Sequence, residues 1–250
     1  MNSPDQPIPV SDEQNALRPG QLWLVPAPLS QQAPAIELLP ADLLRVRLIR
    51  HWLVETPKTA RAWLKLYGHP TPIAELHIQA LADLGTPACL REWLAQADGP
   101  VGVMSDAGCP GVADPGAVAV AQAHALGWPV RPMPGASSIL LGLMGSGLSG
   151  QSFVFHGYVP VETAQRQRFL QDSERQSARL KQTQMAIETP YRNSAFFQAL
   201  CDNLKPDTLL CVASELRGPA EFLRTRRVCD WKKQPPVLGK QATLFLWQAV

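Results

Sequence analysis

The chain lacks the features that mark membrane, secreted and strongly basic proteins. No apolar run approaches the roughly 20 residues of a membrane-spanning helix, and the N-terminus shows no basic-then-apolar signal pattern. The five cysteines are scattered and never spaced as Cys-x-x-Cys, which argues against a disulfide framework or a zinc site. The net charge is only +2, so the whole surface is not a polycation for nucleic acid. These absences predict a cytoplasmic protein with reduced thiols, no metal centre and no membrane contact.

What the chain does have is the composition of a globular α/β protein. Hydrophobic residues make up 46% of its 250 residues, enough for one or two cores, and its 24 prolines imply many fixed turns. Apolar strand patterns alternate with helical ones in the first half, which predicts a largely parallel sheet covered by helices. The expected strands are 22–25, 47–54, 101–104 and 130–133, and the expected helices are 59–67, 86–96, 117–126 and 136–144.

The second half has a different pattern. Strands are expected at 153–158, 184–187, 209–213, 224–229 and 243–247, and helices at 162–180 and 193–203. No helix is expected between the last two strands, which indicates a mixed sheet. The sequence therefore predicts a disordered tail over 1–20, a parallel-sheet α/β domain over 21–133 and a mixed-sheet α/β domain over 134–250.

A loop rich in glycine and proline is the most informative stretch. Residues 105–116 read Ser-Asp-Ala-Gly-Cys-Pro-Gly-Val-Ala-Asp-Pro-Gly and follow an apolar strand, at the strand end where open α/β sheets bind ligands. Its glycines allow a ligand to approach the backbone, and Asp106 and Asp114 offer acceptors for hydroxyl and ammonium groups. The alternative is a plain connector in which Asp114 caps the next helix.

A second loop, Pro132-Met-Pro-Gly-Ala-Ser-Ser138, also joins a strand to a helix. Gly135 opens its backbone, and Ser137 or Ser138 either caps the helix, faces a ligand, or does both.

These two loops, together with Gly145-Ser-Gly-Leu148, resemble the tetrapyrrole methylase superfamily. Within it they are most similar to the ribosomal RNA small subunit methyltransferase I branch, which methylates a cytidine ribose 2′-hydroxyl. Further similarities are Phe155-His-Gly-Tyr-Val-Pro160, Ile187-Glu-Thr-Pro-Tyr-Arg192 and Ser214-Glu-Leu216. The resemblance implies a parallel-sheet domain followed by a mixed-sheet domain, S-adenosylmethionine as cofactor, an RNA or ribosomal subunit as substrate, and a homodimer.

The resemblance also implies which residues hold the cofactor. In the first predicted domain these are Pro26, Ser105, Asp106, Ala107, Gly108, Cys109 and Pro110. In the second they are Gly135, Ser137, Ser138, Glu188, Thr189 and Ala213.

Two segments depart from the branch. A Gly-Asn turn after the first strand is replaced by Pro26-Ala-Pro-Leu-Ser30, and a Glu-Asp-Thr-Arg segment by Glu55-Thr-Pro-Lys58. We expect such changes to affect the acceptor more than the cofactor.

Transfer to a hydroxyl needs a base, and Glu55 and Glu188 are the candidates. Both are also interpretable as ordinary carboxylates near a helix start. Basic residues concentrate at 45–61 and 217–233, which suits RNA but is also typical of solvated surface.

Two other functions remain open. The acceptor could be a tetrapyrrole or another small molecule, or the chain could be a paralogue that binds cofactor or RNA without turnover.

Overall fold

The computed structural model describes residues 17–30, 32 and 37–250, so most of the predicted tail lies outside the described residues. Contacts within the chain divide it into two compact units. The first comprises the described residues up to Ala27 together with 37–135, and the second comprises the described residues of 28–32 together with 136–250.

The first unit is built on a five-stranded sheet with the order β3-β2-β4-β1-β5. Every strand pair in it is parallel. The strands are β1 (Leu22–Leu24), β2 (His51–Val54), β3 (His77–Ala80), β4 (Val101–Met104) and β5 (Val130–Pro132). The predicted parallel-sheet architecture is confirmed.

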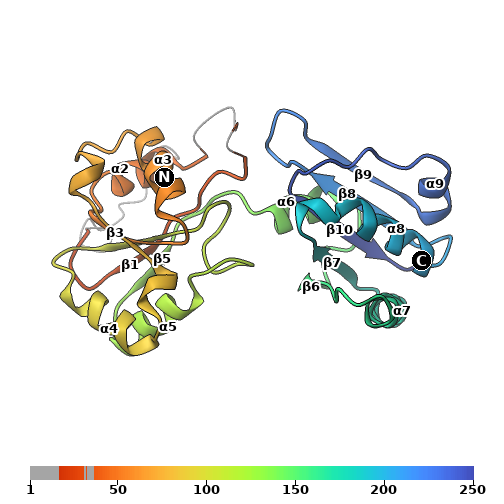
Figure 1. Ribbon diagram of the computed structural model, residues 1–250, viewed down its shortest axis with the longest axis horizontal. Helices are drawn as coiled ribbons and strands as arrows, with labels where there is room; N and C mark the ends of the chain where they lie inside the picture. The colour runs from red at the N-terminus through yellow and green to blue at the C-terminus, as the bar shows by residue number, and fades with distance from the viewer. Residues whose placement is uncertain (1–16, 31, 33–36) are drawn as a thin grey trace, which may run out of the picture. The chain divides into compact units, whose positions relative to one another are not determined.

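Helices cover both faces of this sheet. Helices α4 (Pro87–Gln96) and α5 (Ala117–Ala125) pack side by side below it in Figure 1, and α2 (Pro40–Val46) and α3 (Pro57–Leu66) lie above it. The face under α4 and α5 is sealed by one apolar cluster, in which Leu90 and Leu94 meet Leu53 and Val103 of the strands. Burial on both faces explains why the central strands β1 and β4 read as continuous apolar runs.

Local sequence signals set several helix ends. Thr86 caps α4 by accepting a hydrogen bond from the Cys89 amide, and Pro87 occupies the first turn. Gly127 follows α5 with a φ of 72°, in the left-handed region that glycine adopts easily.

Three expectations for the elements need correction. Residues 47–50 are not strand, because α2 ends only at Val46 and β2 begins at His51. Both α2 and β3 were missed, because each is short and carries only a weak periodic pattern. A short helix, α9 (Val228–Lys233), separates the last two strands, and its Trp231 is buried and donates to the Leu210 carbonyl over 2.7 Å.

The second unit holds a five-stranded sheet with the order β6-β7-β10-β8-β9. The pair β6–β7 is parallel and the other pairs are antiparallel, which confirms the predicted mixed sheet. The strands are β6 (Phe153–Tyr158), β7 (Thr183–Ile187), β8 (Leu209–Ser214), β9 (Phe222–Arg227) and β10 (Thr243–Gln248).

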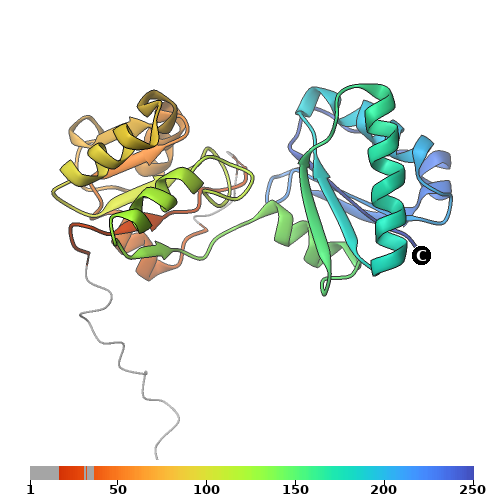
Figure 2. The same cartoon turned by 90° about the horizontal axis from the view of Figure 1, so that it is seen from below.

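Alternation along β10 explains how this second sheet is covered. Leu244 and Leu246 face helix α6 (Ser138–Ser146), while Phe245 and Trp247 face the cluster that includes α7 (Thr163–Leu180) and α8 (Asn193–Asn203). Figure 2 shows the long helix α7 running along this sheet. Short 3-10 turns at Ile73–Glu75, Leu81–Leu84 and Pro190–Arg192 complete the structure. None of the helices within the described residues combines the length and apolarity needed to cross a membrane.

One glycine in the first sheet is required by close packing. A Cβ atom on Gly102 would lie 2.4 Å from Cζ3 of Trp52, whose indole is fully buried and held by a hydrogen bond to the Ile49 carbonyl. The ring therefore has nowhere to move.

We predict that Gly102→Ala destabilises the protein by about 1–3 kcal/mol, because the added methyl group overpacks this contact. Urea unfolding measures the loss. Gly99→Ala is the matched control, since its Cβ would lie 3.6 Å from His51 and needs no adjustment. Equal stability of the two variants would contradict the packing argument.

Candidate functional site

The parallel sheet of the first unit gathers four loops at one edge. Because β5, β1, β4 and β2 are adjacent and parallel, their carboxyl ends lie side by side. The residues that follow them are Met133 after β5, Val25 after β1, Ser105 after β4 and Glu55 after β2. The first-unit residues predicted to bind the cofactor therefore share this edge with Glu55, one of the two predicted bases.

Backbone hydrogen bonds fix the path of the 105–116 loop. Gly108 and Ala27 exchange two such bonds, each of 2.9 Å, which tie the loop to the segment after β1. Gly108 has a φ of 71°, a conformation that favours glycine. The loop closes on itself where the Gly111 amide donates to the Pro115 carbonyl over 3.1 Å.

Gly135 and Pro26 are in direct contact across the same edge. A Cβ on Gly135 would lie 2.3 Å from the Pro26 Cβ, so only glycine fits there. The Tyr67 hydroxyl donates to the Pro26 carbonyl over 3.3 Å, and burial raises the pKa of that hydroxyl far above its usual range. The altered Pro26–Ser30 turn is thus firmly held at its beginning.

Asp106 is held at three atoms by the segment between β2 and the middle of α3. Its amide donates to Glu55 Oε2 over 2.9 Å, and its carbonyl accepts from Trp63 Nε1 over 3.0 Å. Its Oδ2 accepts from the Thr56 hydroxyl over 2.8 Å. The altered Glu55–Lys58 segment therefore contacts the predicted cofactor loop directly, so its changes bear on that loop as well as on the acceptor.

Asp114 completes a group of three carboxylates. Burial, with the negative charges of Glu55 and Asp106, raises the pKa of Asp114 from 3.8 to about 6. Among the described residues none of these three carboxylates has an ion-pair partner. Asp114 does not cap α5, whose N-cap is Gly116 and carries no side-chain bond. The group is electrostatically suited to a cation.

Ser105 adds an unused hydroxyl to the same loop. Its side chain is 2% exposed, and its Oγ has no hydrogen-bond partner among the described residues. An unpaired buried hydroxyl is costly, so this atom is suited to a ligand.

The second unit holds the remaining predicted residues. Ser137 caps α6 by accepting from the Leu140 amide over 3.5 Å, and Ser138 begins that helix. Ala213 lies in β8 and is buried beneath α6, where a Cβ on Gly142 would be 3.7 Å from its methyl group. The capping interpretation of Ser137 is therefore confirmed, and Ala213 offers no exposed side-chain surface.

Glu188 and Thr189 follow β7 at the edge where β8 also ends. The Glu188 side chain is 1% exposed and accepts from Arg192 Nη2 over 2.7 Å and from the Thr189 amide over 2.7 Å. Its carboxylate is therefore engaged with its own chain neighbours and is shielded from solvent. This geometry favours a structural role for Glu188.

Thr56 and Trp63 were not predicted as site residues. They reach Asp106 across 50 and 43 positions of sequence, a distance that no local motif spans. Their signal in the sequence is only that they begin and line a helix directly after β2.

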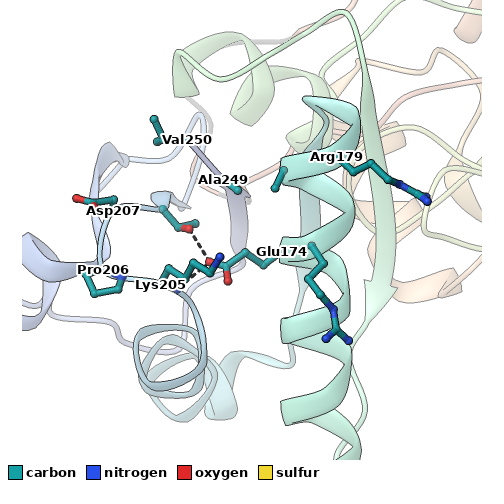
Figure 3. A pocket seen from close by; sticks show the side chains of 10 residues that line it. Glu174, Arg179, Lys205, Pro206, Asp207, Ala249 and Val250 are labelled. Carbon is teal, nitrogen blue, oxygen red and sulfur yellow. Dashed lines mark hydrogen bonds between the residues drawn. The ribbon is translucent and has the colours of Figure 1, made fainter.

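A groove in the second unit lies at the opposite sheet edge from Glu188. It is lined by parts of α7, by the 205–208 loop before β8 and by the residues after β10. Buried Glu174 fills its interior by accepting from the Lys205 amide and the Thr208 hydroxyl, and Arg179 points away from them (Figure 3). Glu174 is thus satisfied by the 205–208 loop, which favours a structural role for this carboxylate. No cluster of metal-ligating side chains occurs within the residues that the structure describes.

Comparison of the sequence with known proteins identifies ribosomal RNA methyltransferases as relatives. Ribosomal RNA small subunit methyltransferase I of Pseudomonas aeruginosa is 28% identical over 192 residues, 74% of this chain and 66% of that protein. The protein of the same name from Bacillus subtilis is 26% identical, with coverage of 88% and 73%. The one from Synechocystis is 36% identical, with coverage of 48% and 42%. No family model matches the chain.

Solved structures of similar fold include several methyltransferases. Uroporphyrin-III-C-methyltransferase from Thermus thermophilus has a TM-score of 0.52 at 18% identity, covering 92% of this chain and 94% of that one. The methyltransferase CobJ reaches 0.61 at 17% identity, covering 92% and 95%. The resemblance to the tetrapyrrole methylases is confirmed.

At these identities the structural similarity establishes the tetrapyrrole methylase-like fold. The matched region covers between about two fifths and three quarters of the length of the three named relatives. Because the match is partial, the relatives' names alone do not establish the activity, substrate or partners of this chain, and its own residues must support them.

The position of Asp114 beside the Glu55 and Asp106 carboxylates predicts how the stability of the protein depends on pH. Because the pKa of Asp114 is raised in the folded protein, its ionisation opposes folding as the pH rises from about 4 through 6. We predict that Asp114→Asn raises Tm by about 2–4 °C at pH 7.5, for a gain on the order of 1 kcal/mol after solvent screening. At pH 4 the two proteins should melt alike. A difference that does not depend on pH would contradict this assignment.

Proposed function

We propose that the protein is an S-adenosylmethionine-dependent methyltransferase that acts on RNA, at a ribose 2′-hydroxyl of small-subunit ribosomal RNA. The observation that carries the proposal is the Ser105–Pro110 loop at the carboxyl edge of the parallel sheet. That loop combines a backbone opened at Gly108, the buried Ser105 hydroxyl and the Asp106 carboxylate. Among the described residues the hydroxyl has no hydrogen-bond partner and the carboxylate has no ion-pair partner.

The residues of this loop fit the cofactor. S-adenosylmethionine, when bound, supplies an electrophilic methyl group on a positively charged sulfur. The carboxylates of Glu55, Asp106 and Asp114 provide negative charge for its cationic groups. Asp106 Oδ1 and Ser105 Oγ are available for polar groups of the ligand, because neither has a partner among the described residues.

The names of the relatives support RNA as the acceptor. All three sequence relatives described above are called ribosomal RNA small subunit methyltransferase I. A homodimer, which the resemblance implies, and a cytoplasmic location, which the scattered cysteines favour, are part of the same proposal.

Of the two candidate bases, Glu55 suits the removal of a proton better than Glu188. Glu55 is half-buried and uses one carboxylate oxygen for the Asp106 amide, which leaves Oε1 to accept a proton. Glu188 is buried against Arg192. The positioned loop and a nearby proton acceptor are what this chain contributes to in-line methyl transfer.

We predict that Gly108→Val weakens the binding of S-adenosylhomocysteine about tenfold or more, because the new side chain is strained at a φ of 71° and fills the loop. Titration calorimetry measures the affinity. Gly127→Val is the matched control, since Gly127 has a φ of 72° and open space around it at the end of α5. Both variants should lose stability, and only Gly108→Val should lose affinity. Equal affinities would remove the loop from the cofactor site.

We further predict that a radiolabelled methyl group from S-adenosylmethionine appears in small-subunit ribosomal RNA, recovered as a 2′-O-methyl nucleoside after nuclease digestion. The assay compares small ribosomal subunits, purified small-subunit RNA and a small-molecule extract that contains tetrapyrroles. Label found only in the small-molecule fraction would refute an RNA acceptor. Cofactor binding without label in any fraction would favour a paralogue without turnover.

A further inference from the structure

Helix α3 has two sides with different properties. Its inner side carries Ala60, Trp63 and Leu64, all buried, and Trp63 holds the Asp106 carbonyl. Its outer side carries Lys58, Arg61 and Lys65, which are all exposed. Their spacing of three and four residues aligns the three cations on one face of the helix.

No acidic residue accompanies these cations on the helix. The sequence of α3 is Pro-Lys-Thr-Ala-Arg-Ala-Trp-Leu-Lys-Leu, without aspartate or glutamate. Within the described part of the chain none of the three cations forms an ion pair. We call Lys58, Arg61 and Lys65 the α3 basic face.

Other basic residues of the same region are already engaged. Arg45 pairs with Asp42 over 2.8 Å, Arg47 donates to the Tyr67 carbonyl over 2.7 Å, and His51 contacts Asp98 over 2.6 Å. The basic concentration at 45–61 is therefore partly structural. Of its other cations, Arg50 is exposed just before β2, and Lys58 and Arg61 are exposed on α3.

Helix α7 provides a contrast. Its exposed arginines, Arg168, Arg175 and Arg179, share the helix with Asp172 and Glu174, and Arg175 pairs with Asp172. Negative charge thus dilutes the positive charge of α7, whereas α3 has none of its own.

The α3 basic face is also fixed relative to the cofactor loop. Thr56 precedes the helix and binds Asp106 Oδ2, and Trp63, which is two residues from both Arg61 and Lys65 and lies on the opposite side of the helix, binds the Asp106 carbonyl. A polyanion on the outer side of α3 would therefore be held by the same helix that positions the loop.

We propose that the α3 basic face binds the phosphate backbone of the RNA substrate and so places the acceptor strand near the 105–116 loop. This inference rests on the proposed function and specifies the surface that recognises RNA. A stripe of three cations matches successive phosphates and reads no bases, so sequence selection lies elsewhere.

The test replaces the three cations together, as Lys58→Gln, Arg61→Gln and Lys65→Gln, and measures binding of small-subunit ribosomal RNA at several salt concentrations. We expect affinity to fall about 10- to 100-fold near 0.1 M salt, and the slope of log affinity against log salt to shrink by about 2–3. The matched control is Arg168→Gln, Arg175→Gln and Arg179→Gln on α7, which removes the same charge. It should change RNA affinity less than about threefold.

Two further measurements keep the outcomes distinct. Calorimetry with S-adenosylhomocysteine should give the same affinity for wild type and both triple variants, and thermal melting should confirm that they fold. If wild type methylates RNA but the α3 variant binds RNA normally, the inference is wrong and the proposed function stands. If wild type binds the cofactor but not RNA, both the RNA acceptor and the assignment of the α3 basic face to RNA binding are wrong. Loss of binding only to vesicles of anionic lipid would assign the face to a membrane instead.

Discussion

The parallel pairing of β1 with β4 and β5 is the constraint on which the candidate site depends. Because the strands run in one direction, the segments after each of them emerge at a single edge. The paired hydrogen bonds between Ala27 and Gly108 extend this pairing beyond the strands. On the β5 side of β1, the close contact of Gly135 with Pro26 packs the segment after β5 against the segment after β1. An antiparallel arrangement of the same segments would scatter them over two edges.

Charge is distributed in opposite ways around α3. Towards the loop lie carboxylates that no cation of the described chain neutralises, and burial, together with their mutual repulsion, raises the pKa of Asp114. On the outer side of the helix lie cations that no carboxylate of the described chain neutralises. The proposed cationic methyl donor and polyanionic acceptor would each meet one of these two groups of opposite charge.

The departures from the ribosomal RNA branch take on a different meaning in the structure. Glu55 and Thr56 stand in the altered segment, yet they hold the amide and the carboxylate of Asp106. The Pro26 turn is held by Tyr67 and by Gly135. Both altered segments therefore support the loop that resembles the family most closely, and they do so through contacts that depend on their own residues.

The sequence by itself determined the elements whose signals are local. The apolar strands β1, β4 and β5, the capped helix α4 and the loop at 105–116 were predictable because caps, glycines and apolar runs act within a few residues. Short elements such as α2, β3 and α9 escaped prediction, because tertiary packing stabilises them more than their own pattern does. Only the tertiary structure decided that Thr56 and Trp63 hold Asp106, that Glu188 pairs with Arg192, and that the cations of α3 are exposed. Those facts depend on which side chains meet after the sheet has formed, and no spacing along the chain encodes them.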